Sequence, residues 1–417
     1  MHPESGVNAA PTPSESEFDV CVMGLGYVGL PTAAILATHG LRVAGVDLRA
    51  DVVSTINAGA IHIVEPELDA LVRAAVQAGT LRAFAAPVPA AAFLICVPTP
   101  LGPNKGPGLD HVEAATRALV PALRPGNLVV LESTVPPGTT RSIVGAIVRE
   151  SGLVPGEDLF VAHAPERVLP GAVLREVVEN ERVVGGLTEA CTDRCARFYE
   201  RFVRGEVHRT RAETAELCKL AENAYRDVNI AYANELANVC ERLGLDVWEV
   251  IALANRHPRV QILRPGPGVG GHCIAVDPWF IVAAAPEQTP LIAAARAIND
   301  ARPAQVLAQI RRLGERLRGR PRVALLGLSY KPDIDDLRES PAMIIAEELH
   351  ARGDVELLLV EPHLARSPIA GVELYAVEDA LAQADIAVIL VAHRAFRGLR
   401  REHLLRPSVI DTVGLLA

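Results

Sequence analysis

Apolar runs of strand length alternate with helical patterns through the first part of the chain. The runs that read as buried strands are residues 18–23, 41–46, 91–97, 128–132 and 159–162. A helical pattern over residues 30–39 separates the first two runs, and Gly40 is placed to end that helix. Regular alternation of buried strands with helices predicts a parallel sheet covered by helices.

The middle of the chain carries one long helical pattern, from residue 213 to residue 243. No proline interrupts it, Gly244 follows its last residue, and Asp246 is placed to cap the next helix. Apolar neighbours such as Leu220 and Ala224 predict that the helix is largely buried. A helix of this length tends to bridge domains or to pair with a copy of itself, so we expect a homodimer.

One polar stripe runs along this predicted helix. Lys219, Asn223 and Arg226 are spaced i, i+4 and i+7 and therefore share a face. A solvated face would show the same spacing. On a largely buried helix, however, a lysine needs a partner or a function, which makes the stripe a candidate binding or catalytic face.

The last third repeats the alternation of strands and helices. Strand-like runs at 322–330, 356–360 and 386–391 alternate with helical patterns at 342–351 and near residue 380, which predicts a second parallel sheet without a GxGxxG turn. A helical stretch that begins near Pro290 contains Pro303, where we expect a domain boundary or a kink.

At 417 residues the chain is long enough for two or three domains, each with its own core. The predicted fold is α/β, with two Rossmann-like parallel-sheet domains joined by a long central helix. We expect a disordered tail rich in Pro, Ser and Glu, a nucleotide-binding domain, a central helical region and a second α/β domain. Their predicted limits are 1–16, 17–210, 211–315 and 316–417.

Composition excludes several classes of function. The chain has 41 basic and 50 acidic residues and no Lys/Arg-rich run, which argues against nucleic acid as a partner. No apolar run reaches the roughly 18 residues of a membrane span. Seven scattered cysteines, an odd number with no signal peptide before them, favour a reduced cytoplasm. Cys191 and Cys195 are helix-spaced and no second pair exists, so we expect no metal.

The first strand runs into Gly24-Leu-Gly26-Tyr-Val-Gly29, and the second ends in Asp47. Glycines at this spacing permit a tight turn and the close approach of a pyrophosphate to a helix N-terminus. A carboxylate at the end of the second strand binds a ribose 2′-hydroxyl and repels a 2′-phosphate, which favours NAD over NADP. The alternative is a glycine turn in another kind of α/β protein.

Polar residues follow three further strands, at the edge where ligands of parallel sheets gather. Thr99 and Thr134 are candidates to line the cofactor crevice, and the common alternative for either is to cap the following helix. After the strand at 159–162, the pair Glu166 and Arg167 is a candidate for substrate contact. A surface ion pair is the alternative for that pair.

Residues 264–280 form the most unusual stretch, because glycines and prolines crowd the residues before Cys273. Such a composition predicts a loop whose backbone lies tightly against something flat. His272 and Asp277 flank a thiol that is nucleophilic as a thiolate, although a buried structural cysteine is the alternative. In the last third, Lys331 and Arg338 are candidates to hold phosphate charge, or to pair with nearby aspartates.

Four motifs together resemble the UDP-sugar 6-dehydrogenase family over essentially the whole chain: GLGYVGLP, KLAENAYRDVN, GVGGHCIAVDP and SYKPDIDDLRESP. The resemblance implies that a sugar C6 alcohol is oxidised twice, with two NAD and no metal. Cys273 would hold the intermediate aldehyde as a thiohemiacetal and then as a thioester. Lys219, with Asn223 beside it, would stabilise the oxyanion or move a proton. Asp277, together with Thr134 or Glu166, would orient or activate water.

The resemblance also implies two sets of binding residues. Those for NAD are Gly24, Gly26, Tyr27, Val28, Gly29, Asp47, Thr99, Thr134 and Arg338. Those for the UDP-sugar are Arg167, Val168, Lys219, Asn223, Arg226, His257, Arg259, Gly270, Tyr330 and Lys331. His257 and Arg259 would come from the neighbouring subunit, so that the dimer shares its active sites.

Three stretches distinguish branches of the family: residues 165–171, 254–261 and 276–278. They resemble the members that form N-acetylhexosaminuronates, and imply UDP-N-acetyl-D-mannosamine as the substrate, in the supply of surface-polysaccharide precursors. UDP-N-acetylglucosamine and UDP-glucose are the alternative substrates. Pro170 stands near the position of a second glutamate in UDP-glucose dehydrogenases, which leaves the base for thioester hydrolysis open. A non-catalytic nucleotide-binding regulator is the alternative from another class.

Overall fold

The computed structural model describes residues 18–63, 65–102, 104–168, 171–271, 273–399, 404 and 407–416. They form two compact units, one that ends at Leu220 and one that begins at Ala221. This division falls inside helix α8 (Ala212–Leu243). The predicted limits at residues 210 and 315 stay predictions, and the predicted tail at 1–16 lies outside the described residues.

The first unit is built on an eight-stranded sheet in the order β3-β2-β1-β4-β5-β6-β7-β8. Its strands are β1 (Phe18–Met23), β2 (Val43–Val46), β3 (Leu81–Phe84), β4 (Ala90–Ile95), β5 (Leu128–Leu131), β6 (Phe160–His163), β7 (Arg182–Gly186) and β8 (Val207–Arg211). All neighbours pair in parallel except β6 and β7. This confirms the predicted nucleotide-binding fold and adds β3, β7 and β8, for which the sequence pattern gave no signal.

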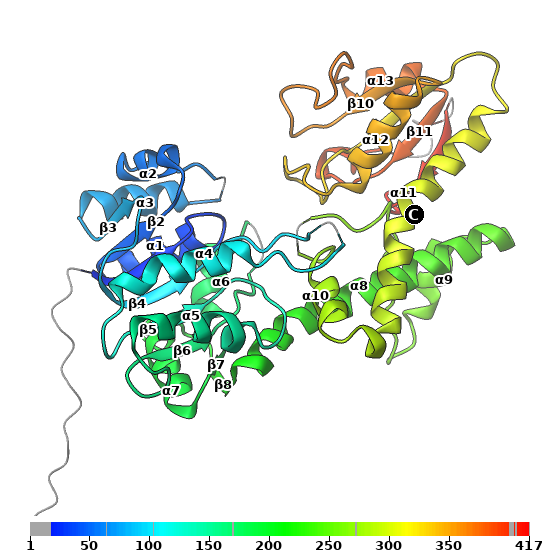
Figure 1. Cartoon of the computed structure of the whole chain (residues 1–417). Coiled ribbons are helices and arrows are strands. Elements are labelled where there is room, and N and C mark those ends of the chain that lie inside the picture. Colours follow the sequence, from blue (N-terminus) through cyan, green and yellow to red (C-terminus); the bar gives the residue numbers. More distant parts are fainter. Residues whose placement is uncertain are drawn as a thin grey trace, which may run out of the picture. The chain divides into compact units, whose positions relative to one another are not determined.

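Helices cover both faces of this sheet (Figure 1). On one face α1 (Gly29–Thr38), α2 (Ala50–Asn57), α3 (Leu68–Gln77), α6 (Val173–Glu179) and α7 (Glu189–Tyr199) share a core with the alternate strand residues Val20 and Val22. On the other face α4 (Asp110–Leu119) packs with Cys21 and Met23. Short turns complete the unit: η1 (Val120–Ala122), η2 (Thr140–Val144), α5 (Gly145–Ile147) and η3 (Val148–Ser151).

The second unit begins with helices. It contains the rest of α8, then α9 (Val247–Ala254), α10 (Asp277–Ala284), η4 (Pro286–Gln288) and α11 (Pro290–Gly314). The predicted helix over 213–243 is confirmed, and the Asp246 side chain caps α9 by accepting the Trp248 N–H at 2.9 Å.

Two predictions about these helices were wrong. Pro303 marks no boundary, because α11 continues through it from residue 290 to residue 314, and the alternative of a kink at this proline stays a prediction. Polar contacts in the turn before Pro303, from Asn299 to Asp227 and from Arg302 to Asn238, tie this part of α11 to α8 and offset the backbone bond that proline cannot make. Nor is α8 largely buried.

One face of α8 is buried, at residues such as Leu220 and Ala224, while Tyr225 and Tyr232 on another face are exposed. The long helix is therefore amphipathic, and its outer face presents large apolar side chains to solvent.

The unit ends in a four-stranded parallel sheet in the order β10-β9-β11-β12. Its strands are β9 (Arg322–Leu326), β10 (Glu356–Val360), β11 (Ile386–Ile389) and β12 (Ser408–Asp411). Helices α11 and α12 (Pro341–Arg352) pack on one face, and α13 (Val377–Gln383) packs on the other with the turn η5 (Arg394–Phe396). The predicted second α/β domain is confirmed. Among the described residues, no helix is long and apolar enough to cross a membrane.

Candidate active site

The glycine turn between β1 and α1 is tightly packed. Gly24 adopts φ +89°, and a Cβ there would lie 2.8 Å from the Cys96 carbonyl oxygen. A Cβ on Gly29 would lie 1.8 Å from the carbonyl oxygen of Gly24, so no side chain fits at either position. The turn therefore has the compact backbone that a pyrophosphate needs at a helix N-terminus. Tyr27 and Val28, between these glycines, remain partly accessible.

Asp47 stands beside this turn, directly after β2. One of its carboxylate oxygens accepts the Leu25 N–H at 3.1 Å, and the other accepts the Arg49 N–H at 3.0 Å. The carboxylate is thus fixed against the glycine turn, which is where an NAD ribose 2′-hydroxyl binds in this type of fold. The residues present fit NAD.

Thr99 and Thr134 follow β4 and β5 at the carboxyl edge of the sheet, and both are half-buried. Neither caps a helix: α4 begins after Leu109, and the next helical turn after Thr134 begins after Thr139. The capping alternative is therefore wrong, and contact with the cofactor stays the prediction for both threonines.

Glu166 follows β6 at the same edge, and Lys219 of α8 lies against it. The Lys219 ammonium donates a hydrogen bond of 2.6 Å to the backbone carbonyl of Glu166. The Glu166 carboxylate points the other way, into the unit, where Arg182 of β7 donates to it at 2.6 Å. The surface ion pair expected as the alternative for Glu166 and Arg167 does not form, because the partner of Glu166 is the buried Arg182. Arg167 and Val168 are half-buried beside it.

Behind Arg182 lies a buried polar network that sequence reasoning missed. The guanidinium stacks over the Tyr199 ring, 4.7 Å from its centre, and the Tyr199 hydroxyl donates to Glu132. The Cys96 thiol donates to the other oxygen of Glu132 at 3.2 Å. Burial raises the pKa of the Glu132 carboxyl, and the nearby Arg182 opposes that rise. The only sequence signal was an arginine at the start of an apolar strand.

In the second unit, the cysteine loop leads directly into α10. Cys273 is exposed, and its carbonyl accepts the N–H groups of Val276 and Asp277, the latter at 2.8 Å. Asp277 is buried at the start of α10 and accepts a 2.6 Å hydrogen bond from the Asn223 amide of α8. The loop thus carries an exposed thiol four residues before a buried carboxylate that binds an amide, and the buried structural cysteine expected as the alternative is wrong. His272 lies outside the described residues.

The glycines of this loop lie against a tyrosine ring. A Cβ on Gly271, which adopts φ +78°, would be 2.8 Å from the edge of the Tyr330 ring. A Cβ on Gly270 would be 2.5 Å from the Glu339 carbonyl oxygen and 2.8 Å from the Tyr330 Cβ. The flat partner predicted for the loop is therefore Tyr330, which joins Gly270 to the SYKPDIDDLRESP segment. Lys331 is half-buried beside it.

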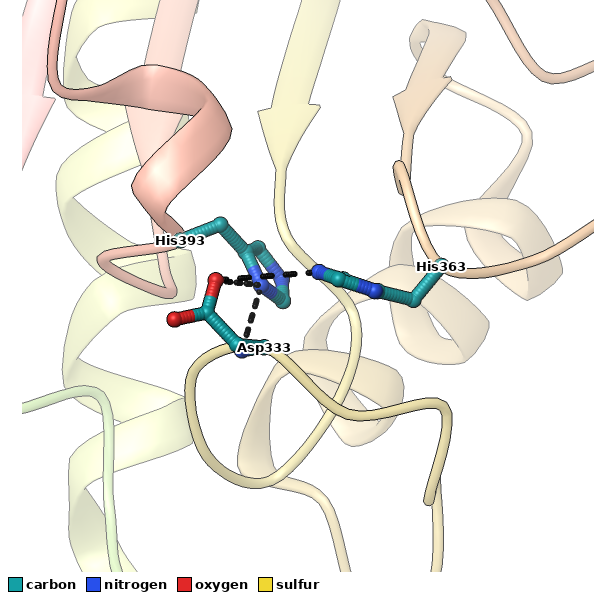
Figure 2. Close-up of side chains that lie close together, drawn as sticks. All are labelled: Asp333, His363 and His393. Carbon is teal, nitrogen blue, oxygen red and sulfur yellow. Dashed lines mark hydrogen bonds and ion pairs between the residues drawn. The ribbon is translucent and has the colours of Figure 1, made fainter. Parts of the chain in front are cut away.

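Polar contacts with residues that follow β10 and β11 hold this segment in place, and Figure 2 shows those that Asp333 makes with His363 and His393. Asp333, with φ +63°, donates its backbone N–H to His393 Nδ1 at 2.9 Å. The opposite nitrogen of His393 lies 3.1 Å from the buried Glu361 carboxylate, which also accepts the Leu328 and Ser329 N–H groups. His363 Nε2 lies 3.7 Å from the Asp333 carboxylate. These contacts fix the loop that carries Lys331 and Arg338.

The donor atoms of Asp333, His363 and His393 lie within 4.8 Å of one another, a spacing that a metal could bridge. Hydrogen bonds already occupy the donor atoms of Asp333 and His393, however. The Nδ1 lone pair of His393 accepts the Asp333 N–H, and Arg394 donates to both oxygens of the Asp333 carboxylate. We therefore interpret the group as a structural network.

The remaining predicted residues are accessible. Arg226 is exposed on α8, and His257 and Arg259 are exposed in the turn after α9. Arg338 is also exposed and pairs with Asp336 through hydrogen bonds of 2.6 and 2.9 Å, as the local-pairing alternative predicted for it. Their contacts with ligands stay predictions.

The chain matches models of a known protein family. Three models of the UDP-glucose/GDP-mannose dehydrogenase family match it in order: the NAD binding domain over residues 18–203, the central domain over 213–301 and the UDP binding domain over 324–417.

Similar whole proteins are known. An NDP-N-acetyl-D-galactosaminuronic acid dehydrogenase of Ralstonia nicotianae is 55% identical, over 95% of this chain and 96% of its own length. A UDP-N-acetyl-D-mannosamine dehydrogenase of Escherichia coli K12 is 47% identical, over 95% and 98%. The solved UDP-D-ManNAc dehydrogenase of Pyrococcus horikoshii has a TM-score of 0.88 at 38% identity and covers 96% of each chain. Together with the glycine turn and its aspartate, these matches establish that the chain belongs to the UDP-glucose/GDP-mannose dehydrogenase family, as an NAD-dependent UDP-sugar 6-dehydrogenase.

Proposed function

We propose that this enzyme oxidises UDP-N-acetyl-D-mannosamine at C6 to UDP-N-acetyl-D-mannosaminuronate, through covalent intermediates on Cys273. The observation that carries the mechanism is an exposed thiol on a loop that is fixed by Tyr330 and leads into a buried carboxylate. The glycine turn and Asp47 would hold NAD, which would supply the hydride acceptor for both oxidations.

Cys273 carries the intermediates between these oxidations. Its thiol adds to the C6 aldehyde, with a proton passing to the carbonyl oxygen, and the product is a thiohemiacetal that still holds a hydride on carbon. Loss of that hydride and of the hydroxyl proton gives a thioester. Water then adds to the thioester carbon, the thiol leaves, and the carboxylate is released. Because the aldehyde stays bound, the second oxidation does not compete with its escape.

Charged and polar side chains support this series of reaction steps. We assign stabilisation of the negative oxygen, and transfer of its proton, to Lys219 and Asn223. The Asp277 carboxylate accepts a hydrogen bond from the Asn223 amide. This bond holds the carboxylate at one end of the cysteine loop, where we assign it the role of orienting water. Glu166 is less suited to act as a base through its carboxylate, since Arg182 and the Arg167 N–H engage both of its oxygens. We therefore propose that Glu166 contributes through its backbone carbonyl, which accepts a hydrogen bond from Lys219.

Two substrates have specific support. UDP-N-acetyl-D-mannosamine is favoured by the residues at 165–168 and 276–278, and by relatives of that name that are 46–49% identical. The second candidate is the nucleotide of N-acetylgalactosamine, because relatives named for N-acetyl-D-galactosaminuronic acid are 53–55% identical. Both share the N-acetylhexosamine class and the same chemistry at C6.

We also propose a homodimer through the outer face of α8. Tyr225, Tyr232 and Val239 repeat every seven residues on this face and are 73%, 56% and 47% exposed. Large apolar side chains in such a row are typical of an interface with a second helix. Sedimentation of the Tyr232→Asp variant tests this: we expect monomers where the unaltered protein sediments as a dimer, and a monomeric unaltered protein would contradict it. The seven free cysteines are consistent with action in a reduced cytoplasm.

Two variants of Cys273 test the covalent mechanism. Cys273→Ala is expected to abolish steady-state formation of the acid while NAD binding, measured by calorimetry, is unchanged. Cys273→Ser is expected to stall after one slow turnover, because an oxygen ester hydrolyses more slowly than a thioester. Continued acid formation by Cys273→Ala would refute covalent catalysis by this residue.

A further inference from the structure

The peptide group between Glu166 and Arg167 is held on both of its sides. Its carbonyl accepts the Lys219 ammonium at 2.6 Å. Its N–H, which belongs to Arg167, donates to the Glu166 carboxylate at 2.8 Å. The orientation of a planar peptide is set by whatever holds its N–H, so the Glu166 carboxylate determines where the carbonyl that receives Lys219 points.

That carboxylate is in turn anchored by Arg182. The guanidinium donates to its second oxygen at 2.6 Å, and both side chains are more than nine-tenths buried. The same nitrogen lies 3.4 Å from the Pro165 carbonyl, so Arg182 contacts two consecutive residues of the loop. The Tyr199 ring packs against the guanidinium and limits its movement.

We propose that Arg182 is a positioning residue for the dehydrogenase reaction: it orients the Glu166–Arg167 peptide and thereby places the Lys219 ammonium. This inference rests on the proposed function for the role of Lys219, but the geometry on which it depends lies entirely within the first unit. Arg182 itself contacts no substrate. Its effect passes through the Glu166 carboxylate, the peptide plane and the carbonyl oxygen in that order.

A purely stabilising ion pair would make a different prediction. Loss of such a pair lowers stability and the yield of folded enzyme, but the molecules that do fold keep their rate. Loss of a positioning contact lowers kcat in correctly folded molecules, because a misplacement of about 1 Å in a catalytic group can cost about a hundredfold in rate. The two roles therefore separate in kcat and in the state of Lys219.

The sequence offers a direct probe of that state. Lysine occurs at positions 105, 219 and 331 only, so amine labelling of this chain gives three assignable lysine signals besides that of the N-terminal amine. Brief acetylation with acetic anhydride, read by mass spectrometry, reports the reactivity of Lys219 relative to Lys105 in the same molecule. This readout requires no turnover. Loss of a hydrogen bond of ordinary strength is expected to raise that ratio about fivefold.

The experiment compares Arg182→Lys and Arg182→Met with Arg209→Met, which removes an exposed arginine paired with Glu200 in the same unit. Arg182→Met is expected to lower kcat about tenfold or more and to raise the Lys219 labelling ratio, while KM for NAD changes little. Arg182→Lys keeps the charge and is expected to give a smaller change of the same kind. Arg209→Met is expected to change neither quantity. If Arg182→Met does not fold, the kcat and the Lys219 labelling ratio of Arg182→Lys alone test the proposal.

A second cycle tests whether Arg182 acts through Lys219. In a Lys219→Ala background, Arg182→Lys is expected to have no further effect on kcat, because the group it places is gone. An unchanged labelling ratio in both Arg182 variants, or an equal loss of kcat with and without Lys219, would overturn the proposal. Failure of the unaltered enzyme to oxidise any UDP-sugar would instead refute the proposed function, and the labelling ratio would still decide the role of Arg182.

Discussion

The buried ion pair between α8 and α11 gives a quantitative prediction about the second unit. Arg296 of α11 donates to Asp227 of α8 at 2.6 Å, and their side chains are 2% and 0% exposed. Burial raises the pKa of Asp227, and Arg296 opposes that rise. Arg296→Met keeps most of the side-chain volume but leaves a buried carboxylate with only the Asn299 amide at 2.8 Å.

We expect Arg296→Met to lower the free energy of unfolding of this unit by about 3–5 kcal/mol, which is typical when one partner of a buried pair is removed. The double variant Arg296→Met/Asp227→Asn removes both charges and is expected to recover most of that loss. A matched control is available in Arg312→Met. Arg312 of α11 pairs with Glu241 of α8 between the same two helices, but these side chains are 57% and 43% exposed. Its expected cost is below about 1 kcal/mol.

Urea unfolding followed by tryptophan fluorescence measures this effect selectively. Both tryptophans of the chain, Trp248 and Trp279, lie in the second unit, in α9 and α10. The protein concentration is kept constant, because a dimer would make the apparent stability depend on it. The loss in Arg296→Met is expected to shrink as the pH falls, since protonation of Asp227 removes the unpaired charge. A loss no larger than that of Arg312→Met would contradict the cost expected for leaving the buried Asp227 carboxylate unpaired.

Two further predictions concern the first unit. Gly29→Ala is expected to abolish NAD binding, measured by calorimetry, because its Cβ would lie 1.8 Å from the Gly24 carbonyl oxygen; near-normal affinity would contradict the packing described for the turn. Burial lowers the pKa of His163 to about 3, from about 6.5 when unfolded. The contribution of neutral His163 to the free energy of unfolding is therefore complete above pH 6.5 and is lost as the pH falls toward 3. Between pH 6.5 and 5 this residue is expected to remove about 2 kcal/mol of stability. In circular-dichroism urea titrations His163→Leu should lose less over this range than the unaltered protein, and equal losses would contradict the assignment.

Much of the fold followed from local pattern. The glycine turn, Asp47 and the helix at 213–243 each carry a signal within a few residues, because glycine, a strand-end carboxylate and an unbroken helical run have strong local preferences. The structure places them as predicted. The pairing of Asn223 with Asp277 required the fold, since 54 residues separate them.

Other features have no local signal. Strand β7 reads Arg182-Val-Val-Gly-Gly, in which a charged residue and two glycines hide a central strand. The glycines are explained only by close packing: a Cβ on Gly186 would lie 2.3 Å from the Thr192 backbone nitrogen. Pro303 shows the converse, because a strong local signal for a break is overridden by tertiary contacts of α11 with α8. The role of Arg182 likewise depends on which loop its strand meets.

The most direct test of covalent catalysis on Cys273 is the yield of NADH per UDP-N-acetyl-D-mannosamine consumed, with the N-acetylgalactosamine and N-acetylglucosamine nucleotides run in parallel. We expect about two NADH per mannosamine substrate and little turnover of the other two, because the same carbon is oxidised twice on Cys273 before release. Two NADH with only another N-acetylhexosamine nucleotide would keep the mechanism and replace the substrate. A yield near one NADH would show that the aldehyde leaves the enzyme, and would contradict covalent retention on Cys273.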